Sequence, residues 1–70
     1  MQAKVDGNVV KVGDVVYFKS DVEQCGTIAE IRMARFGTGH ELTLTSETGF
    51  SGEYIGGQTQ TVERARDCWL

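Results

Sequence analysis

Apolar and polar residues alternate with a period of two along several stretches of the chain, as in strands that bury one face. The clearest alternation covers residues 40–45, where we expect Leu42 and Leu44 to point inward and the opposite face to carry Glu41, Thr43 and Thr45. No window of eleven residues keeps a helical apolar period without a glycine or a break in the pattern. The pattern therefore predicts an all-β fold.

Turn residues divide the first part of the chain into short strands. Asp6 and Gly7 supply the positive φ angles of a tight turn, so residues 4–5 and 9–11 are predicted to form a hairpin. A second turn at Gly13 leads into a strand over residues 14–19. Both faces of this strand are apolar, so we expect it to be central; they carry Val16 and Phe18 on one side and Val15 and Tyr17 on the other.

The middle of the chain predicts a polar loop over residues 20–24, a strand over residues 25–34 and a glycine-bearing connection over residues 35–39. Ile28 and Ile31 are three residues apart, which breaks strict alternation and predicts a bulge or bend near Ala29 and Glu30. At the start of this strand, Gly26 is expected to provide a positive φ or a close approach between strands, whereas Gly37 is expected to be more tolerant of valine than Gly26.

The last part of the chain predicts a turn over residues 46–52, a strand over residues 58–62 and a helical or 3-10 turn within residues 63–68. Trp69 is then expected to close the core. With about five strands and no linker or repeat, residues 1–70 are expected to form a single domain.

The order of these elements resembles SH3-like barrels, including KOW-type modules. The resemblance rests on a Gly-Asp turn at Gly13 and Asp14 that feeds a strand, a polar loop, a Gly-x-apolar step at Gly26, and a final strand, helical turn and apolar residue. It implies a small, partly open barrel. The chain also looks like small accessory proteins of tailed phages, on the strength of residues 18–24 and 54–59.

Length and charge narrow the classes of function. A chain of 70 residues hides only about 60% of its unfolded surface, so it offers a single small core and little room for an enclosed active site. Its net charge of −3 weakens any general affinity for nucleic acid. No apolar run is long enough to span a bilayer and no secretory signal is evident, so we expect a cytoplasmic protein, in the host cell if a phage encodes it.

Metal and disulfide chemistry have little support in the sequence. Cys25 and Cys68 are far apart and His40 is the only histidine, so the ligand pairs of a structural zinc site are missing and we expect neither a metal nor a cofactor. Both cysteines are interpreted as small thiols, buried or half-buried. Whether they lie close in space stays open.

The segment around the double glycine is the one that packing explains least. Two adjacent glycines cost backbone entropy, and exposed glutamines bury little. We interpret the segment either as a kink that lets a strand turn a corner or as a partner-binding surface formed by Tyr54, Gly56, Gly57, Gln58 and Gln60. Copies of Gln58 and Gln60 around an oligomer axis would also line a pore. Plasmid-type dihydrofolate reductases, which are SH3-like, build such a pore, but the Val-Gln-Ile-Tyr stretch they use is not matched here.

Basic residues suggest a second kind of surface. If the cations gathered on one side of the barrel near Tyr17 and Phe36, they would contact phosphates and stack on bases; the residues concerned are Lys4, Lys11, Lys19, Arg32 and Arg35. The alternative interpretation is a set of solvated charges on edge strands.

Catalysis by a single chain has the weakest support. The acidic residues have no spacing that fixes a pair, and His40 has no serine or cysteine nucleophile in a recognisable elbow. We therefore expect a non-catalytic binding module that engages a protein, with self-association as one version. The alternatives are a nucleic-acid-binding module and, with less support, a pore-type small-molecule site.

Overall fold

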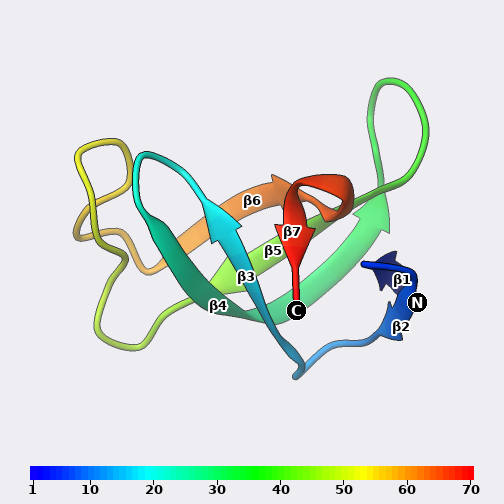
Figure 1. The fold of residues 1–70 in the computed structure, drawn as a ribbon, viewed down its shortest axis with the longest axis horizontal. Helices are drawn as coiled ribbons and strands as arrows, with labels where there is room; N and C mark the ends of the chain where they lie inside the picture. The colour runs from blue at the N-terminus through cyan, green and yellow to red at the C-terminus, as the bar shows by residue number, and fades with distance from the viewer.

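The computed structural model describes residues 1–70 and contains two antiparallel sheets (Figure 1). The small sheet pairs β1 (Ala3–Val5) with β2 (Asn8–Val10). The large sheet has the order β6-β5-β4-β3-β7 and is built from β3 (Val15–Lys19), β4 (Glu23–Met33), β5 (His40–Thr45), β6 (Gln60–Arg64) and β7 (Cys68–Trp69). A 3-10 turn, η1 (Ala65–Asp67), joins β6 to β7. The predicted all-β class is confirmed.

Local sequence signals place several elements correctly. The β1–β2 hairpin turns at Asp6 and Gly7, whose φ angles of 53° and 76° are those of a type I′ turn. β5 has the predicted bounds, and the register between β4 and β5 shifts between Ile28 and Glu30, where the bulge is predicted.

Two strands begin two residues away from their predicted start, because pairing extends one and shortens the other at that end. Glu23 and Gln24 belong to β4 and not to a loop, since they pair with Lys19 and Phe18 of β3. β6 begins at Gln60, two residues later than expected. The segment before it is held in a compact loop that spans residues 46–59.

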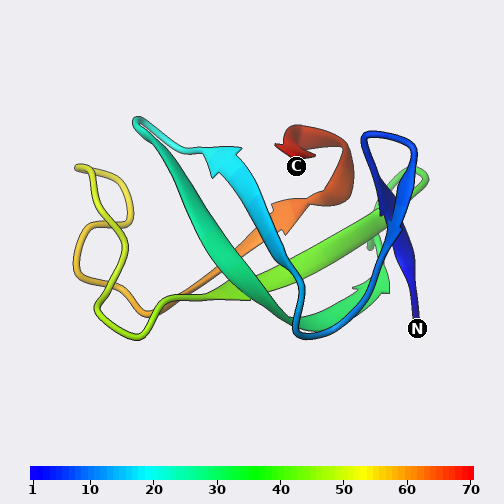
Figure 2. The same ribbon diagram turned by 60° about the horizontal axis from the view of Figure 1, so that its bottom comes forward.

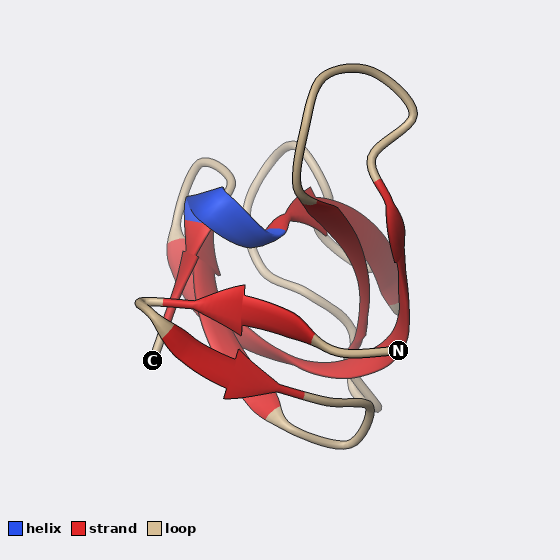
Figure 3. Ribbon diagram, turned by 90° about the vertical axis from the view of Figure 1, so that its right-hand side faces the viewer, coloured by secondary structure: helices blue, strands red, loops and turns tan.

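The large sheet curls around the core but does not close (Figure 3). β6 and β7 are its two edges, and η1 bridges the opening between them. The β1–β2 hairpin covers one end of the curled sheet, and the loop over residues 46–59 lies at the opposite end (Figures 1 and 2). The N–H of Leu70 donates to the carboxylate of Asp6 at 2.9 Å, which ties the end of β7 to the hairpin. The structure contains no helix of the length and apolar character needed to cross a bilayer.

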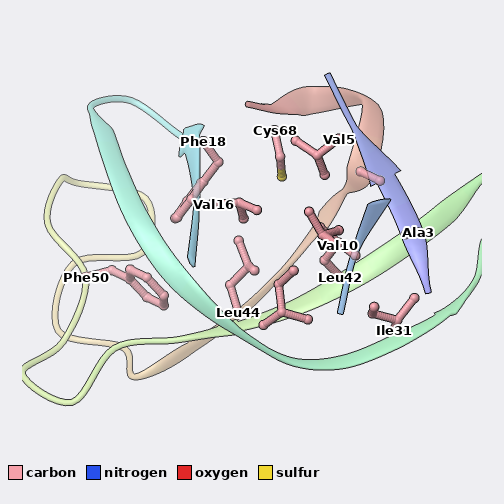
Figure 4. Close-up of a cluster of buried hydrophobic side chains, with 12 residues drawn as sticks. Ala3, Val5, Val10, Val16, Phe18, Ile31, Leu42, Leu44, Phe50 and Cys68 are labelled. Atoms are coloured by element: carbon pink, nitrogen blue, oxygen red, sulfur yellow. The ribbon is translucent and has the colours of Figure 1, made fainter. Parts of the chain in front are cut away.

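The core combines the concave face of the sheet with the apolar side of the hairpin (Figure 4). The rings of Phe18 and Phe50 meet edge to face at 5.5 Å between centroids. The largest fully buried side chains are those of Phe18, Ile28, Leu42, Leu44, Val5 and Val16. Ile55 packs against this core from the loop, and Gly26 is buried beneath Leu44 and Phe50.

The predicted burial of Trp69 needs correction. Trp69 is only half-buried, because β7 pairs it with the outward Tyr17, while Cys68 pairs with Phe18 and fills the core position. The prediction that β3 is central is confirmed, because it has a neighbour on each side, although Val15 and Tyr17 on its outer face remain about half exposed.

The alternation of residues 40–45 predicts that Thr43 faces solvent, and this prediction is wrong: Thr43 is buried. It lies between Glu30 of β4 and Val62 of β6, and we attribute its burial to these cross-strand neighbours.

Candidate functional site

The backbone of β6 is unpaired along its outer edge. The N–H of Ser46 donates to the carbonyl of Thr59 at 3.0 Å, in the register that continues the β5–β6 ladder. Backbone groups of an antiparallel strand point alternately to its two sides, so Thr61 and Glu63 also face β5. Gln60, Val62 and Arg64 therefore direct their N–H and C=O groups away from the sheet.

One of these groups is already used. The thiol of Cys68 donates to the carbonyl of Arg64 at 3.4 Å, so this end of the edge is tied to β7. The open stretch consists of the N–H and C=O groups of Gln60 and Val62 together with the N–H of Arg64. Both Gln60 and Val62 are exposed, the latter at 42%. This stretch of β6 is called the β6 edge below.

The loop that leads into the β6 edge is anchored to the rest of the molecule. The carboxylate of Asp21 accepts a hydrogen bond of 2.7 Å from the N–H of Glu53, and this backbone donor lowers the pKa of Asp21 below its usual 3.8. The side chain of Gln24 exchanges two hydrogen bonds with the backbone of Ser51, at 2.8 and 3.0 Å. The loop therefore has a defined shape although most of it is exposed.

The structure explains why two adjacent glycines, Gly56 and Gly57, stand in this loop. A Cβ at Gly56 would collide with the carbonyl oxygen of Gly52, and Gly57 has a φ of 83°. This geometry supports the interpretation of a kink. It leaves Tyr54, Gln58 and Gln60 as the exposed side chains of the predicted surface, with Tyr54 exposed at 73%.

The inner face of β6 carries a carboxylate at the opening of the sheet. Glu63 pairs with the buried Leu42 and accepts a hydrogen bond of 3.1 Å from the hydroxyl of Thr61. Burial raises the pKa of Glu63 above its usual value, and the charge of Asp67 adds to this effect. An inward-pointing charge on an edge strand discourages indiscriminate pairing with other chains.

The predicted basic surface does not assemble. Lys11 forms an ion pair with Asp14, whose pKa is lowered by the backbone N–H of Lys11, and Arg32 pairs with Glu41 at 3.1 Å. Lys19 lies at the end of β3 that pairs with the start of β4, whereas Arg35 follows the far end of β4.

Arg35 and the exposed Phe36 stand instead on the projecting loop between β4 and β5 (Figure 1). The structure does not gather the four cations proposed for nucleic acid, which are Lys11, Lys19, Arg32 and Arg35.

A row of side chains on the convex face was not recognised from the sequence. Tyr17 pairs with Cys25 on one side and Trp69 on the other, so the three share the outer face. Cys25 is exposed, contrary to the prediction, because it lies on this face. Cys68 pairs with the inward Phe18, so the two thiols belong to opposite faces and both are free.

Groups suited to catalysis are not brought together. The His, Cys, Asp and Glu side chains form no cluster of three that would hold a metal ion. His40 begins β5 beside Met33 of β4, with no nucleophile paired to it.

Comparisons with protein-family models, curated proteins and solved structures find no match to this chain.

Proposed function

We propose that the chain is a non-catalytic binding module that takes up an extended segment of a protein along the β6 edge. The observation that carries this proposal is the row of unpaired backbone groups formed by Gln60, Val62 and the N–H of Arg64. Such groups bind an added strand through main-chain hydrogen bonds, while neighbouring side chains select its sequence.

The residues around the edge support a selective contact. Gln58 and Gln60 offer amide groups, Val62 offers a small apolar surface, and Tyr54 extends from the adjoining loop. The buried part of Glu63 restricts which strands fit, because a partner residue placed over it must tolerate a carboxylate.

The fold is proposed to be an SH3-like, partly open barrel. The order of strand, polar turn, glycine-led strand, 3-10 turn and final strand supports this assignment. A segment added at the β6 edge would then enter the gap that the barrel leaves open between β6 and β7.

The decisive variant is Val62→Pro. Proline at this position removes an outward N–H and no bond to β5, and proline is tolerated on edge strands in that orientation. Thr61→Pro is the contrasting variant, because it removes an N–H directed at β5 and should destabilise the sheet.

The assay is selection of random extended peptides displayed on a surface, followed by calorimetry with the enriched sequences. Peptides should bind the wild type and lose roughly tenfold or more in affinity for a folded Val62→Pro variant, since one main-chain hydrogen bond and its neighbours are lost. Enriched peptides that bind both proteins equally, or a failure to enrich any, would contradict the proposal. Sedimentation of the wild type tests whether a second copy is the partner: a strict monomer removes that version.

A further inference from the structure

The largest hollow of the molecule lies away from the β6 edge, where the β1–β2 hairpin, the start of β5 and η1 come together. It has a volume of about 520 Å³. The hairpin and η1 pack against each other on the same side of the curled sheet (Figure 3). The volume falls within the usual size of small-molecule sites.

Small apolar residues and basic residues line this hollow. Ala3 and Ala65 are both buried and contribute small side chains. Lys4, His40 and Arg66 also line it, each from a different element. No aspartate or glutamate contributes to the lining. We call it the basic hollow.

Two cations of the basic hollow take no part in ion pairs within the protein. Lys4 and Arg66 form no ion pair, whereas Lys11 and Arg32 do. Two acidic residues close in sequence already accept hydrogen bonds: Asp6 accepts one from the N–H of Leu70, and Glu41 accepts one from Arg32. A third, Asp67, does not line the hollow.

The chain carries ten acidic residues and seven basic ones, so this lining differs in sign from its net charge. Two cations that line one hollow repel each other, and an anion between them would add two attractive interactions that outweigh this repulsion. Arginine donates in a planar fork that matches phosphate oxygens, lysine adds a point charge, and a histidine ring adds a further donor.

We propose that the basic hollow binds a small organic phosphate, with the phosphate group between Lys4 and Arg66 and an apolar body over Ala3 and Ala65. His40 would donate to the same phosphate group. The site is independent of the β6 edge, so either proposal can fail without the other.

The test is a titration of ¹⁵N-labelled protein with phenyl phosphate, followed by the backbone amide shifts in NMR spectra. The shifts should saturate and be largest at the residues of the hollow, which include Ala3, Lys4, Gly39, His40 and Arg66. Phenol, which keeps the ring and lacks the charge, should cause no saturable change at the same amides.

Three variants locate the interaction. Lys4→Gln and Arg66→Gln each remove one exposed cation and should weaken binding about tenfold, the factor of one charge-assisted hydrogen bond. Lys19→Gln removes an unpaired cation at the far end of the sheet and should leave the affinity unchanged. Unchanged amide spectra away from the substituted residue show that each variant is folded.

Three results would overturn the proposal. They are a lack of saturable shifts with phenyl phosphate, equal binding of phenol, and an equal loss of affinity in Lys4→Gln and Lys19→Gln. The last result would mean that the anion responds to overall charge and not to the hollow.

Discussion

Gly26 gives the sharpest test of how the sheet is packed. The structure shows that its role is a close approach and not a positive φ. A Cβ built at this position lies 3.0 Å from the Cβ of Leu44 and 3.3 Å from the ring of Phe50. Both neighbours belong to the buried core, so neither has room to move away.

Valine at position 26 adds two further methyl groups beyond this crowded Cβ. Overpacking of this kind costs about 2 kcal/mol, a large share of the roughly 5 kcal/mol or less that a domain of this size holds. For a domain of this length, the loss should lower the thermal midpoint by roughly 8 to 16 °C. Gly26→Ala should cost less, because the single methyl group is partly offset by a less flexible unfolded chain.

The control for this variant has to be chosen from the structure. Gly37 is predicted to be more tolerant of valine than Gly26, but its φ of 80° makes a β-branched residue strained there as well. Thr27→Val is the better match, because it places the same side chain on the exposed face of the neighbouring position in β4.

The assay is thermal unfolding followed by circular dichroism. If Gly26→Val melts together with Thr27→Val, the inferred packing of β4 against Leu44 is wrong. A second measurement tests the contact itself: Phe50→Leu removes the ring atoms nearest the added Cβ, so the double variant should lose less stability than the sum of the two single variants.

Three further predictions follow from titratable groups. Cys25 is exposed, whereas burial raises the pKa of Cys68 to about 11. A thiol reagent should therefore modify Cys25 quickly in the folded protein and both cysteines after denaturation. Cys25→Ser should abolish the fast reaction. A backbone donor lowers the pKa of Asp21 below 3.8, so its carboxylate stabilises the fold above that pH and this contribution is lost as the pH falls through the folded value; the thermal midpoint of Asp21→Asn should therefore decline less in acid than that of the wild type. Burial raises the pKa of Glu63 above 4.5, so stability should fall as the pH rises from 4.5 through the folded value; Glu63→Gln should melt higher than the wild type at neutral pH, and an equal or lower midpoint would contradict this reasoning.

Elements whose signals are local were predictable from the sequence. The hairpin follows from Asp6 and Gly7, whose φ angles only a few residue types adopt readily. The bounds of β5 follow from its alternation, and the bulge in β4 follows from the spacing of Ile28 and Ile31.

Features that depend on distant pairing were not predictable. The register of β7 on β3 decides that Cys68 is buried and Trp69 is only half-buried, and two adjacent apolar residues give no sign of this choice. The basic hollow likewise combines Lys4, His40 and Arg66 from three separate elements. The sequence indicates that Gly56 has a structural role in the loop. Only the fold shows what that role is: the carbonyl oxygen of Gly52 leaves no room for a side chain at position 56.

The hydrogen bond between Asp6 and Leu70 joins residues 64 positions apart, and it bears on how the protein is made. Synthesis proceeds from the N-terminus, so the hairpin and β3 leave the ribosome well before the residues of β7 that pair with β3. Until then, the apolar sides of Val5 and Val16 have only part of their final surroundings. Folds that rely on such late, distant partners form slowly, and their early strands are exposed to association with other nascent chains.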